Sequence, residues 1–115
     1  MDYRSVVREM RRQNKRMYQL TGEAGVAQND LYEKCMADGA LDRKTKELIG
    51  VAIGVYNRCQ YCICVHTHGA YQAGATREEI LAAAEVAIAF GGGPSVAYSA
   101  SVLNAALDEF EHDFD

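Results

Sequence analysis

Apolar residues recur at helical spacing in six successive segments that together fill most of this 115-residue chain. The helices are expected at about residues 3–20, 26–38, 43–56, 59–74, 77–90 and 94–110. Valine-rich stretches lie inside these longer segments and do not form the alternating pattern typical of strands. The sequence therefore predicts an all-α protein of about six helices.

Local signals mark where several of these helices begin and end. Asp42 can accept hydrogen bonds from the unpaired N–H groups at the start of the third helix. Gly74 suits a helix C-terminus, and Thr76 with Glu79 has the spacing of a capping box. Pro94 suits the first turn of the last helix.

The length of the chain fits a single domain, residues 1–115, and an apolar content of 49% is enough for a real core. A domain of this size buries a modest fraction of its surface, so oligomerisation would add stability. The fifth helix is rich in alanine, and its second half has no polar face. Deep burial or a subunit interface would explain that face, and we expect a homo-oligomer in which helices pack against helices.

The overall charge and hydropathy of the chain indicate that neither nucleic acid nor a membrane is its partner. The formal net charge is −4 and there is no basic stripe, so nucleic acid is not an expected partner. No apolar run reaches the length of a membrane span, and the first residues lack the features of a signal peptide. We therefore expect a cytoplasmic protein that does not bind membranes.

Charge is distributed unevenly along the chain. Basic residues crowd the first helix at Arg4, Arg8, Arg11, Arg12, Lys15 and Arg16. Acidic residues crowd the tail at Asp108, Glu109, Glu111, Asp113 and Asp115, with His112 expected to be solvated among them. The favoured interpretation is two solvated faces at opposite ends of the molecule. The alternative is that the basic helix meets the acidic tail, within a subunit or across an interface.

Three of the four cysteines lie within six residues, in the segment Cys59-Gln60-Tyr61-Cys62-Ile63-Cys64-Val65-His66. In a helix each residue advances by about 100°, so with Cys59 at zero, Cys62 falls near 300° and His66 near 340°. Cys64 and His68 fall near 140° and 180°, on the opposite face. Outside a secreted disulfide framework, such a cluster is more often redox-active or metal-binding.

Glu47 lies twelve residues before Cys59 and is the last charged residue ahead of an apolar run. It is either a surface carboxylate on the first turns of its helix or a carboxylate that reaches into the core towards the next helix. The spacing leaves both alternatives open.

The remaining cysteines and their neighbours are expected to be structural. Leu31, Cys35 and Met36 are expected to face inward from the second helix. Cys64 is expected in the core, and His68 as a buried or interfacial hydrogen-bonding residue.

The residue types around Cys62 suit thiol–disulfide chemistry. A thiolate attacks a hydroperoxide oxygen and becomes a sulfenic acid, which a second thiol one turn away converts to a disulfide. The N-terminus of a helix favours the thiolate of a cysteine in its first turn, where Cys59 lies. His66 can accept a thiol proton, and a carboxylate such as Glu47 can fix its tautomer and stabilise the imidazolium.

Glu47, the pattern Cys59-x-x-Cys62-x-x-x-His66 and the turn Ala73-Gly74-Ala75-Thr76-Arg77-Glu78-Glu79-Ile80 together resemble a known family. It is the alkylhydroperoxidase AhpD-like core of the carboxymuconolactone decarboxylase superfamily. The resemblance covers about residues 40–107. Members that act as decarboxylases or lactone enzymes lack the cysteine pair, so the resemblance points to redox chemistry.

The resemblance implies an all-helical homotrimer or homohexamer without a tightly bound cofactor. It implies that Cys62 attacks the hydroperoxide substrate, that Cys59 resolves the product as a disulfide, and that Glu47 and His66 relay a proton. The electrons would come from a dithiol reductant, such as a protein-bound dihydrolipoyl group. The best-studied members carry a histidine between the two cysteines, where this chain has Tyr61. Tyr61 is either a wall of the pocket or a hydroxyl donor to the peroxide.

Two other functions fit the same residues. Cys59, Cys62 and His66 could hold three corners of a zinc site, with Glu47 or water as the fourth ligand. The chain could also be a non-catalytic helical assembly protein whose cysteines are merely buried.

Overall fold

The computed structural model describes residues 2–115, and over those residues it contains helices and turns without strands. The helices are α1 (Tyr3–Leu20), α2 (Glu23–Met36), α3 (Arg43–Tyr56), α4 (Gln60–Gln72), α5 (Arg77–Gly91), α6 (Gly93–Tyr98), the π-helical segment η1 (Ser99–Leu103) and α7 (Asn104–Phe110). The last three follow one another without a break, so they act as one helix with a π segment. The all-α class and the six helical units predicted from the sequence are confirmed.

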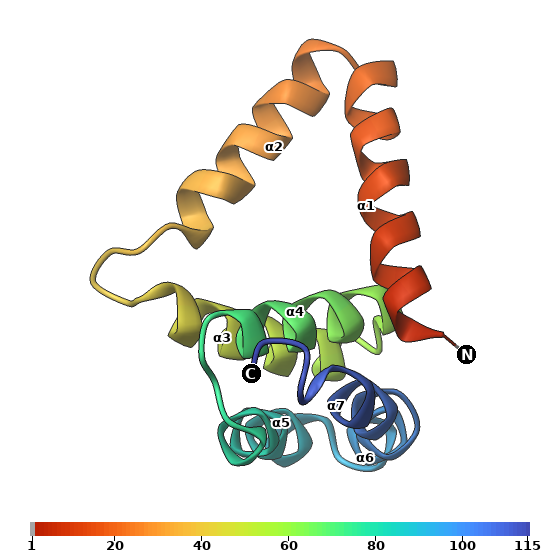
Figure 1. The fold of residues 1–115 in the computed structure, drawn as a ribbon, viewed down its shortest axis with the longest axis vertical. Helices are drawn as coiled ribbons and strands as arrows, with labels where there is room; N and C mark the ends of the chain where they lie inside the picture. The colour runs from red at the N-terminus through yellow and green to blue at the C-terminus, as the bar shows by residue number, and fades with distance from the viewer. Residues whose placement is uncertain (1) are drawn as a thin grey trace.

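The helices form two parts (Figure 1), and these differ in how many of their side chains are buried. α3 and α4 lie side by side, with α5, α6 and α7 on one side of them, and α1 and α2 rise from the other side like two edges of a triangle. Fully buried side chains from α3, α4, α5, η1 and α7 make the core, including Val51, Val55, Ile63, Leu103 and Phe110. α1 and α2 together bury only Tyr3, Val7 and Gly25.

The second helix differs from its prediction in start and in burial. α2 begins at Glu23, because Gly22 at φ +61° makes the turn and Gly25 lies inside the helix, close against the end of α1. Leu31 is 56% exposed and Cys35 is exposed, so the prediction that they face inward is wrong; Met36 is half-buried. The cause lies in the tertiary structure. In Figure 1, α2 stands away from the core, so among residues 2–115 no other helix packs on the side of α2 that carries Leu31 and Cys35.

The predicted capping residues act as expected. Asp42 accepts a hydrogen bond from the Thr45 N–H at 2.8 Å at the start of α3. Thr76 and Glu79 form a complete capping box at the start of α5, and Gly74 adopts φ +94° after α4. Pro94 lies in the first turn of α6.

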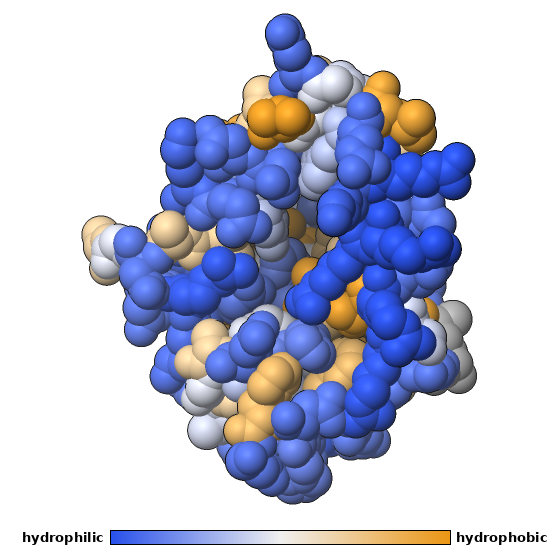
Figure 2. All heavy atoms as spheres, turned by 45° about the horizontal axis from the view of Figure 1, so that its top comes forward, coloured by the Kyte–Doolittle hydropathy of each residue, from blue (hydrophilic) through white to orange (hydrophobic). Residues whose placement is uncertain are grey.

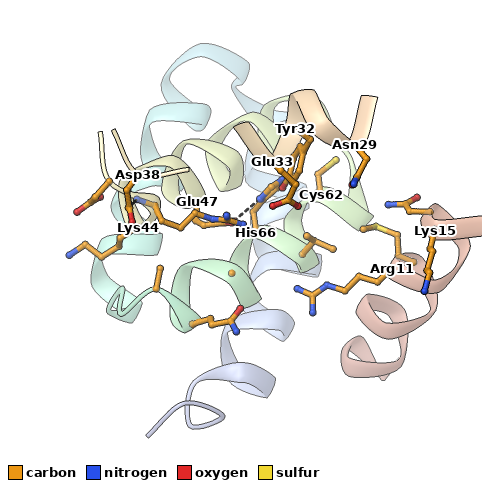
Figure 3. Close-up of a pocket in the computed structure, with 18 of the residues that line it drawn as sticks. Arg11, Lys15, Asn29, Tyr32, Glu33, Asp38, Lys44, Glu47, Cys62 and His66 are labelled. Atoms are coloured by element: carbon orange, nitrogen blue, oxygen red, sulfur yellow. Dashed lines mark hydrogen bonds and ion pairs between the residues drawn. The ribbon is translucent and has the colours of Figure 1, made fainter. Parts of the chain in front are cut away.

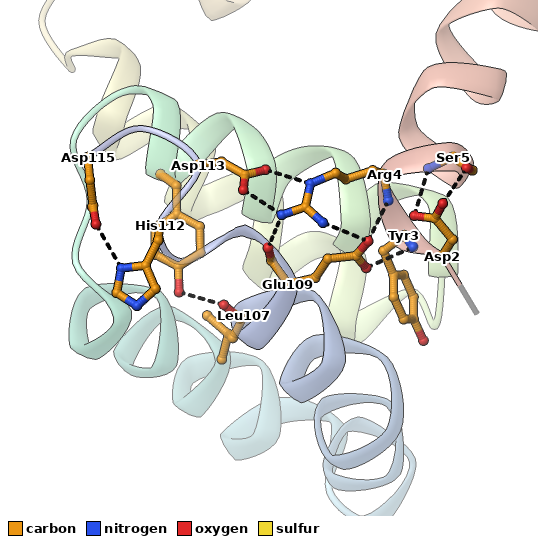
Figure 4. Close-up of polar contacts among 10 residues, drawn as sticks. Asp2, Tyr3, Arg4, Ser5, Leu107, Glu109, His112, Asp113 and Asp115 are labelled. Carbon is orange, nitrogen blue, oxygen red and sulfur yellow. Dashed lines mark hydrogen bonds and ion pairs between the residues drawn. The ribbon is translucent and has the colours of Figure 1, made fainter.

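The acidic tail returns to the start of the basic helix (Figure 4). Arg4 contacts Glu109 at 3.3 Å, and its Nε donates to Asp113 at 3.0 Å. The Tyr3 N–H also donates to Glu109, at 2.8 Å. For Arg4 the favoured interpretation of opposite solvated ends is therefore wrong, because α7 ends beside the first turn of α1. His112 is exposed as predicted and pairs with Asp115.

One face of α3 and α5 leaves large apolar side chains exposed. Phe90 is 80% exposed, and Ile53, Tyr56 and Val86 are each more than half exposed. Deep burial of the second half of α5 is thus wrong for this single chain, and the subunit interface stays a prediction. Within residues 2–115, no helix is both long and apolar enough to cross a membrane.

Candidate functional site

The cysteine pair occupies the first turn of α4. Arg58, at φ +55°, reverses the chain after α3, and the Cys59 N–H donates to the Gly54 carbonyl at 2.9 Å. This turn makes Cys59 the N-cap of α4, one residue outside the predicted helix, with its Sγ accepting from the Cys62 N–H at 3.2 Å. Cys59 and Cys62 are joined as a disulfide, with their Cα atoms 5.3 Å apart. In the reduced protein, the unpaired N–H groups and dipole of α4 would favour thiolate here.

Glu47 and His66 join α3 to α4 inside the protein. The Glu47 Oε2 lies 2.8 Å from the His66 Nδ1, and the Glu47 residue is 2% exposed. The sequence left open whether Glu47 is a surface carboxylate or reaches into the core. In the structure it is buried and faces His66 on the next helix. Arg43, one turn earlier on α3, donates from Nε to the Glu47 Oε1 at 2.9 Å.

The charge state of Glu47 follows from these partners. Burial alone opposes ionisation, but the hydrogen bonds and positive charge of His66 and Arg43 outweigh it and hold the pKa of Glu47 below its usual value. An ionised carboxylate accepts from the His66 Nδ1–H. In the neutral imidazole this leaves Nε2 without a proton, able to take one from a thiol.

Three glycines allow the close packing of this site. A Cβ at Gly50 would lie 2.6 Å from the His66 ring, and one at Gly69 would lie 2.5 Å from the Glu47 carboxylate. A Cβ at Gly54 would lie 3.1 Å from the Cys62 Cβ. Their role was not predicted from the sequence. The available signal was the spacing of Gly50 and Gly54 by one turn inside a helix, where glycine costs stability and a close approach explains it.

A cavity of about 1190 Å³ opens over these residues between α1, α2, α3 and α4. We call it the α1–α4 cavity. Cys62, His66 and Glu47 all line it, whereas Cys59 does not (Figure 3). Figure 2 shows a hollow on this side of the molecule, with a mostly hydrophilic rim and hydrophobic side chains inside. Its other lining residues include Arg11, Lys15, Glu33, Asp38 and Lys44.

The tyrosines that line this cavity, Tyr18 and Tyr32, are not the one the sequence singled out. Tyr61 is 57% exposed and does not line the α1–α4 cavity, so it is no wall of that pocket. Tyr32 reaches in from α2, with its ring centroid 6.4 Å from that of His66. Nothing local in the sequence marked Tyr32, because the fold alone brings α2 over α4. Arg43 was missed although its spacing of four residues from Glu47 on one helix was an available signal.

The opposite face of α4 has a different environment. Cys64 is fully buried, as predicted, and burial raises the pKa of its thiol to about 12. His68 lies edge-on between Phe110 and Phe114, at centroid distances of 5.1 Å and 5.0 Å. Burial lowers the pKa of His68, and its Nδ1 has no hydrogen-bond partner among residues 2–115. Cys35 is a free, exposed thiol outside the α1–α4 cavity.

The geometry gives the zinc alternative no support. Across the described chain, residues 2–115, no group of three or more histidine, cysteine or acidic side chains is arranged to hold a metal ion. Glu47 faces His66 and Arg43, and the two sulfur atoms face each other.

The chain is similar in sequence to a known family and to two relatives. The family model for the carboxymuconolactone decarboxylase family matches residues 23–105. The uncharacterized protein 4 of the cox locus in Paracoccus denitrificans is 39% identical over 95 residues, which cover 79% of this chain and 85% of the relative. An uncharacterized protein of Cupriavidus necator is 32% identical over 102 residues, covering 89% and 90%.

Solved structures agree with the sequence matches. A carboxymuconolactone decarboxylase family protein from Legionella pneumophila, solved in its apo form, superposes with a TM-score of 0.83 at 34% identity, covering 98% of this chain and 97% of its own. A family protein from Thermotoga maritima with a suggested role in the antioxidative response gives a TM-score of 0.78 at 27% identity, covering 95% and 96%. With most of its length matched in sequence and in fold, the chain belongs to the carboxymuconolactone decarboxylase family.

Proposed function

We propose that this protein is a thiol–disulfide oxidoreductase that reduces hydroperoxides, with Cys62 as the attacking thiolate and Cys59 as the resolving thiol. One observation carries the proposal: Cys62 lines the α1–α4 cavity beside the buried His66–Glu47 pair, with Cys59 bonded to it one turn away. A substrate in the cavity can therefore reach Cys62, whereas Cys59 lies outside the lining.

In the first step His66 activates Cys62. The Nε2 of His66 takes the Cys62 thiol proton, and the Glu47 carboxylate stabilises the resulting imidazolium through Nδ1. The thiolate attacks the terminal oxygen of the hydroperoxide, and the O–O bond breaks. The sulfur is oxidised to a sulfenic acid, and the other oxygen leaves and takes up a proton as the alcohol.

In the second step Cys59 resolves the sulfenic acid. Its thiol attacks the Cys62 sulfur, the S–O bond breaks, and water leaves as the disulfide forms. The observed pairing, with Cα atoms 5.3 Å apart, supports this step because it lies within the range of protein disulfides. Fast resolution would protect Cys62 from irreversible oxidation.

In the third step an external dithiol restores the enzyme. One of its thiolates attacks the Cys59–Cys62 disulfide, and its second thiol releases the reduced protein while the dithiol becomes a cyclic disulfide. A dihydrolipoyl group has this chemistry. The suggested antioxidative role of the Thermotoga maritima relative supports the same class of reaction.

Single-turnover chemistry in the Cys59→Ser variant tests the proposal. Without a resolving thiol, one equivalent of cumene hydroperoxide should leave a sulfenic acid at Cys62, which dimedone traps and mass spectrometry locates. Cys35→Ser should be present throughout, because the exposed Cys35 thiol would otherwise react. A dimedone adduct at Cys64, or a Cys62 thiol that survives the peroxide, would contradict the assignment.

A further inference from the structure

Tyr32 reaches from α2 towards the proposed reaction centre and has no part in the steps above. Its side chain lines the α1–α4 cavity with Cys62 and His66, and its ring centroid lies 6.4 Å from the His66 ring (Figure 3). Tyr32 comes from a different helix than the cysteines and from the opposite wall of the cavity. A hydroperoxide attacked by Cys62 would therefore lie between the two.

The Tyr32 hydroxyl is free to act on a substrate. No hydrogen-bond partner for it is found among residues 2–115, although the residue is half-buried. Burial, reinforced by the nearby Glu47 charge, raises the pKa of the phenol, so it keeps its proton at neutral pH. A protonated phenol with no partner inside the protein is a hydrogen-bond donor directed at the cavity.

Hydroperoxide reduction needs such a donor. When the thiolate attacks the terminal oxygen, negative charge develops on the oxygen that leaves, and an alkoxide is a poor leaving group unless a donor stabilises it. His66 has one nitrogen bound to Glu47, and its other nitrogen takes the thiol proton. On the opposite wall, the Tyr32 ring lies 6.4 Å from the His66 ring, measured between centroids, and carries a hydroxyl donor.

We propose that Tyr32 is a catalytic residue that donates a hydrogen bond to the departing alkoxide oxygen of the hydroperoxide. This inference rests on the proposed peroxidase function. The step balances, because the alkoxide gains one proton in total and His66 holds the one that left the Cys62 thiol. Tyr32 gives its own proton to the alkoxide, or shares it, and recovers one from the His66 imidazolium, so both side chains return to their starting state.

The leaving group of the oxidant gives the sharpest test. tert-Butyl hydroperoxide expels a strongly basic alkoxide, whereas peracetic acid expels a weakly basic carboxylate that needs little help from a donor. Tyr32→Phe keeps the ring against His66 and removes only the hydroxyl. It should lower kcat/KM for tert-butyl hydroperoxide by about a hundredfold, a typical effect of one acid–base group, and change the rate with peracetic acid by less than about threefold.

Two controls separate this role from a structural one. Tyr56→Phe removes a hydroxyl from a tyrosine that does not line the α1–α4 cavity and should leave both rates unchanged. Alkylation of Cys62 by iodoacetamide in the Cys35→Ser background expels iodide, which needs no proton, so Tyr32→Phe should leave that rate unchanged. If Tyr32 only held the site together, the alkylation rate and both peroxide rates would fall in parallel.

The outcomes distinguish this inference from the proposed function. A wild-type protein that is inert towards both oxidants contradicts the peroxidase itself, and the role of Tyr32 with it. An active wild type with an equally active Tyr32→Phe variant contradicts the role of Tyr32 alone. An equal loss with both oxidants also contradicts it, because a donor to the leaving oxygen must act on the poorer leaving group more strongly.

Discussion

The two faces of α4 carry the same residue types in two different environments. On one face Cys62 lines the α1–α4 cavity, and His66 bonds to the buried Glu47. On the other face Cys64 is fully buried, with a pKa raised to about 12, and His68 lies between two phenylalanine rings without a carboxylate partner. The same pair of residue types, a cysteine and a histidine four residues apart on a helix, thus meets two environments. In the proposed function, access to the cavity and a carboxylate partner distinguish Cys62 and His66 from Cys64 and His68.

The strongest contrast between the faces is expected from removing each cysteine. Cys62→Ser should abolish peroxide consumption, because no other thiol lines the cavity. Cys64→Ser should barely change it, although a hydroxyl buried without a partner costs about 1–3 kcal/mol of unfolding free energy. Steady-state turnover with cumene hydroperoxide, and urea unfolding for stability, give both values. Equal loss of activity in the two variants would show that the faces do not differ as described.

Substitutions at the two histidine sites of α4 should also differ in their effect on kcat/KM. Glu47→Gln removes the carboxylate charge that stabilises the His66 imidazolium and should lower kcat/KM by about 10²-fold, within the range for acid–base groups. His68→Gln, on the other face, should leave kcat/KM within about twofold of wild type, because it touches no reacting group. The reaction is followed at several pH values. A similar loss of kcat/KM in the two variants would contradict the difference between the two faces of α4.

A smaller effect is expected from a glycine on the same face of α4 as Cys62 and His66. Gly69→Ala introduces a Cβ at 2.5 Å from the Glu47 carboxylate, so either Glu47 or α4 must move. A misplacement of about 1 Å at a catalytic group can cost up to about 10²-fold, and we expect a loss of about tenfold in kcat/KM. Gly39→Ala is the matched control, since its Cβ would have only the Lys46 Nζ nearby, at 3.9 Å. Full activity in Gly69→Ala would show that the site tolerates displacement of Glu47.

The smallest effect concerns pH and stability on the His68 face. The folded-state pKa of His68 is lowered by burial, so the unfolded chain binds a proton more readily. The free energy of unfolding should therefore fall as pH drops below the ordinary value of 6.5. His68→Gln should reduce this fall between pH 7.5 and about pH 5, measured by urea unfolding. His112→Gln should not reduce it, since the pKa of His112 is shifted in the opposite direction.

The helices and their caps were predictable because their signals are local. The capping box at Thr76 and Glu79, the Asp42 cap and the face on which Cys62 and His66 lie all depend on spacing within one helix. Helical geometry alone also placed Cys64 on the face opposite Cys62 and His66.

Features that depend on the packing of distant segments were not predictable in this way. Spacing could not decide whether Glu47 is buried, because that depends on how α3 meets α4. The position of Tyr32 in the cavity and the exposure of Cys35 depend on where α2 lies relative to the other helices. The contact between Arg4 and Asp113 joins the two ends of the chain, and the charge pattern only offered it as an alternative.

The most direct test of the central claim is a thiol count on the native, reduced Cys35→Ser protein before and after one equivalent of cumene hydroperoxide. If the two faces of α4 differ as described, Cys59 and Cys62 disappear together, mass mapping finds them joined, and Cys64 stays unmodified until the protein is unfolded. If Cys64 is alkylated in the native protein, or if Cys59 and Cys62 survive the peroxide, the account of a reactive and a protected face is contradicted.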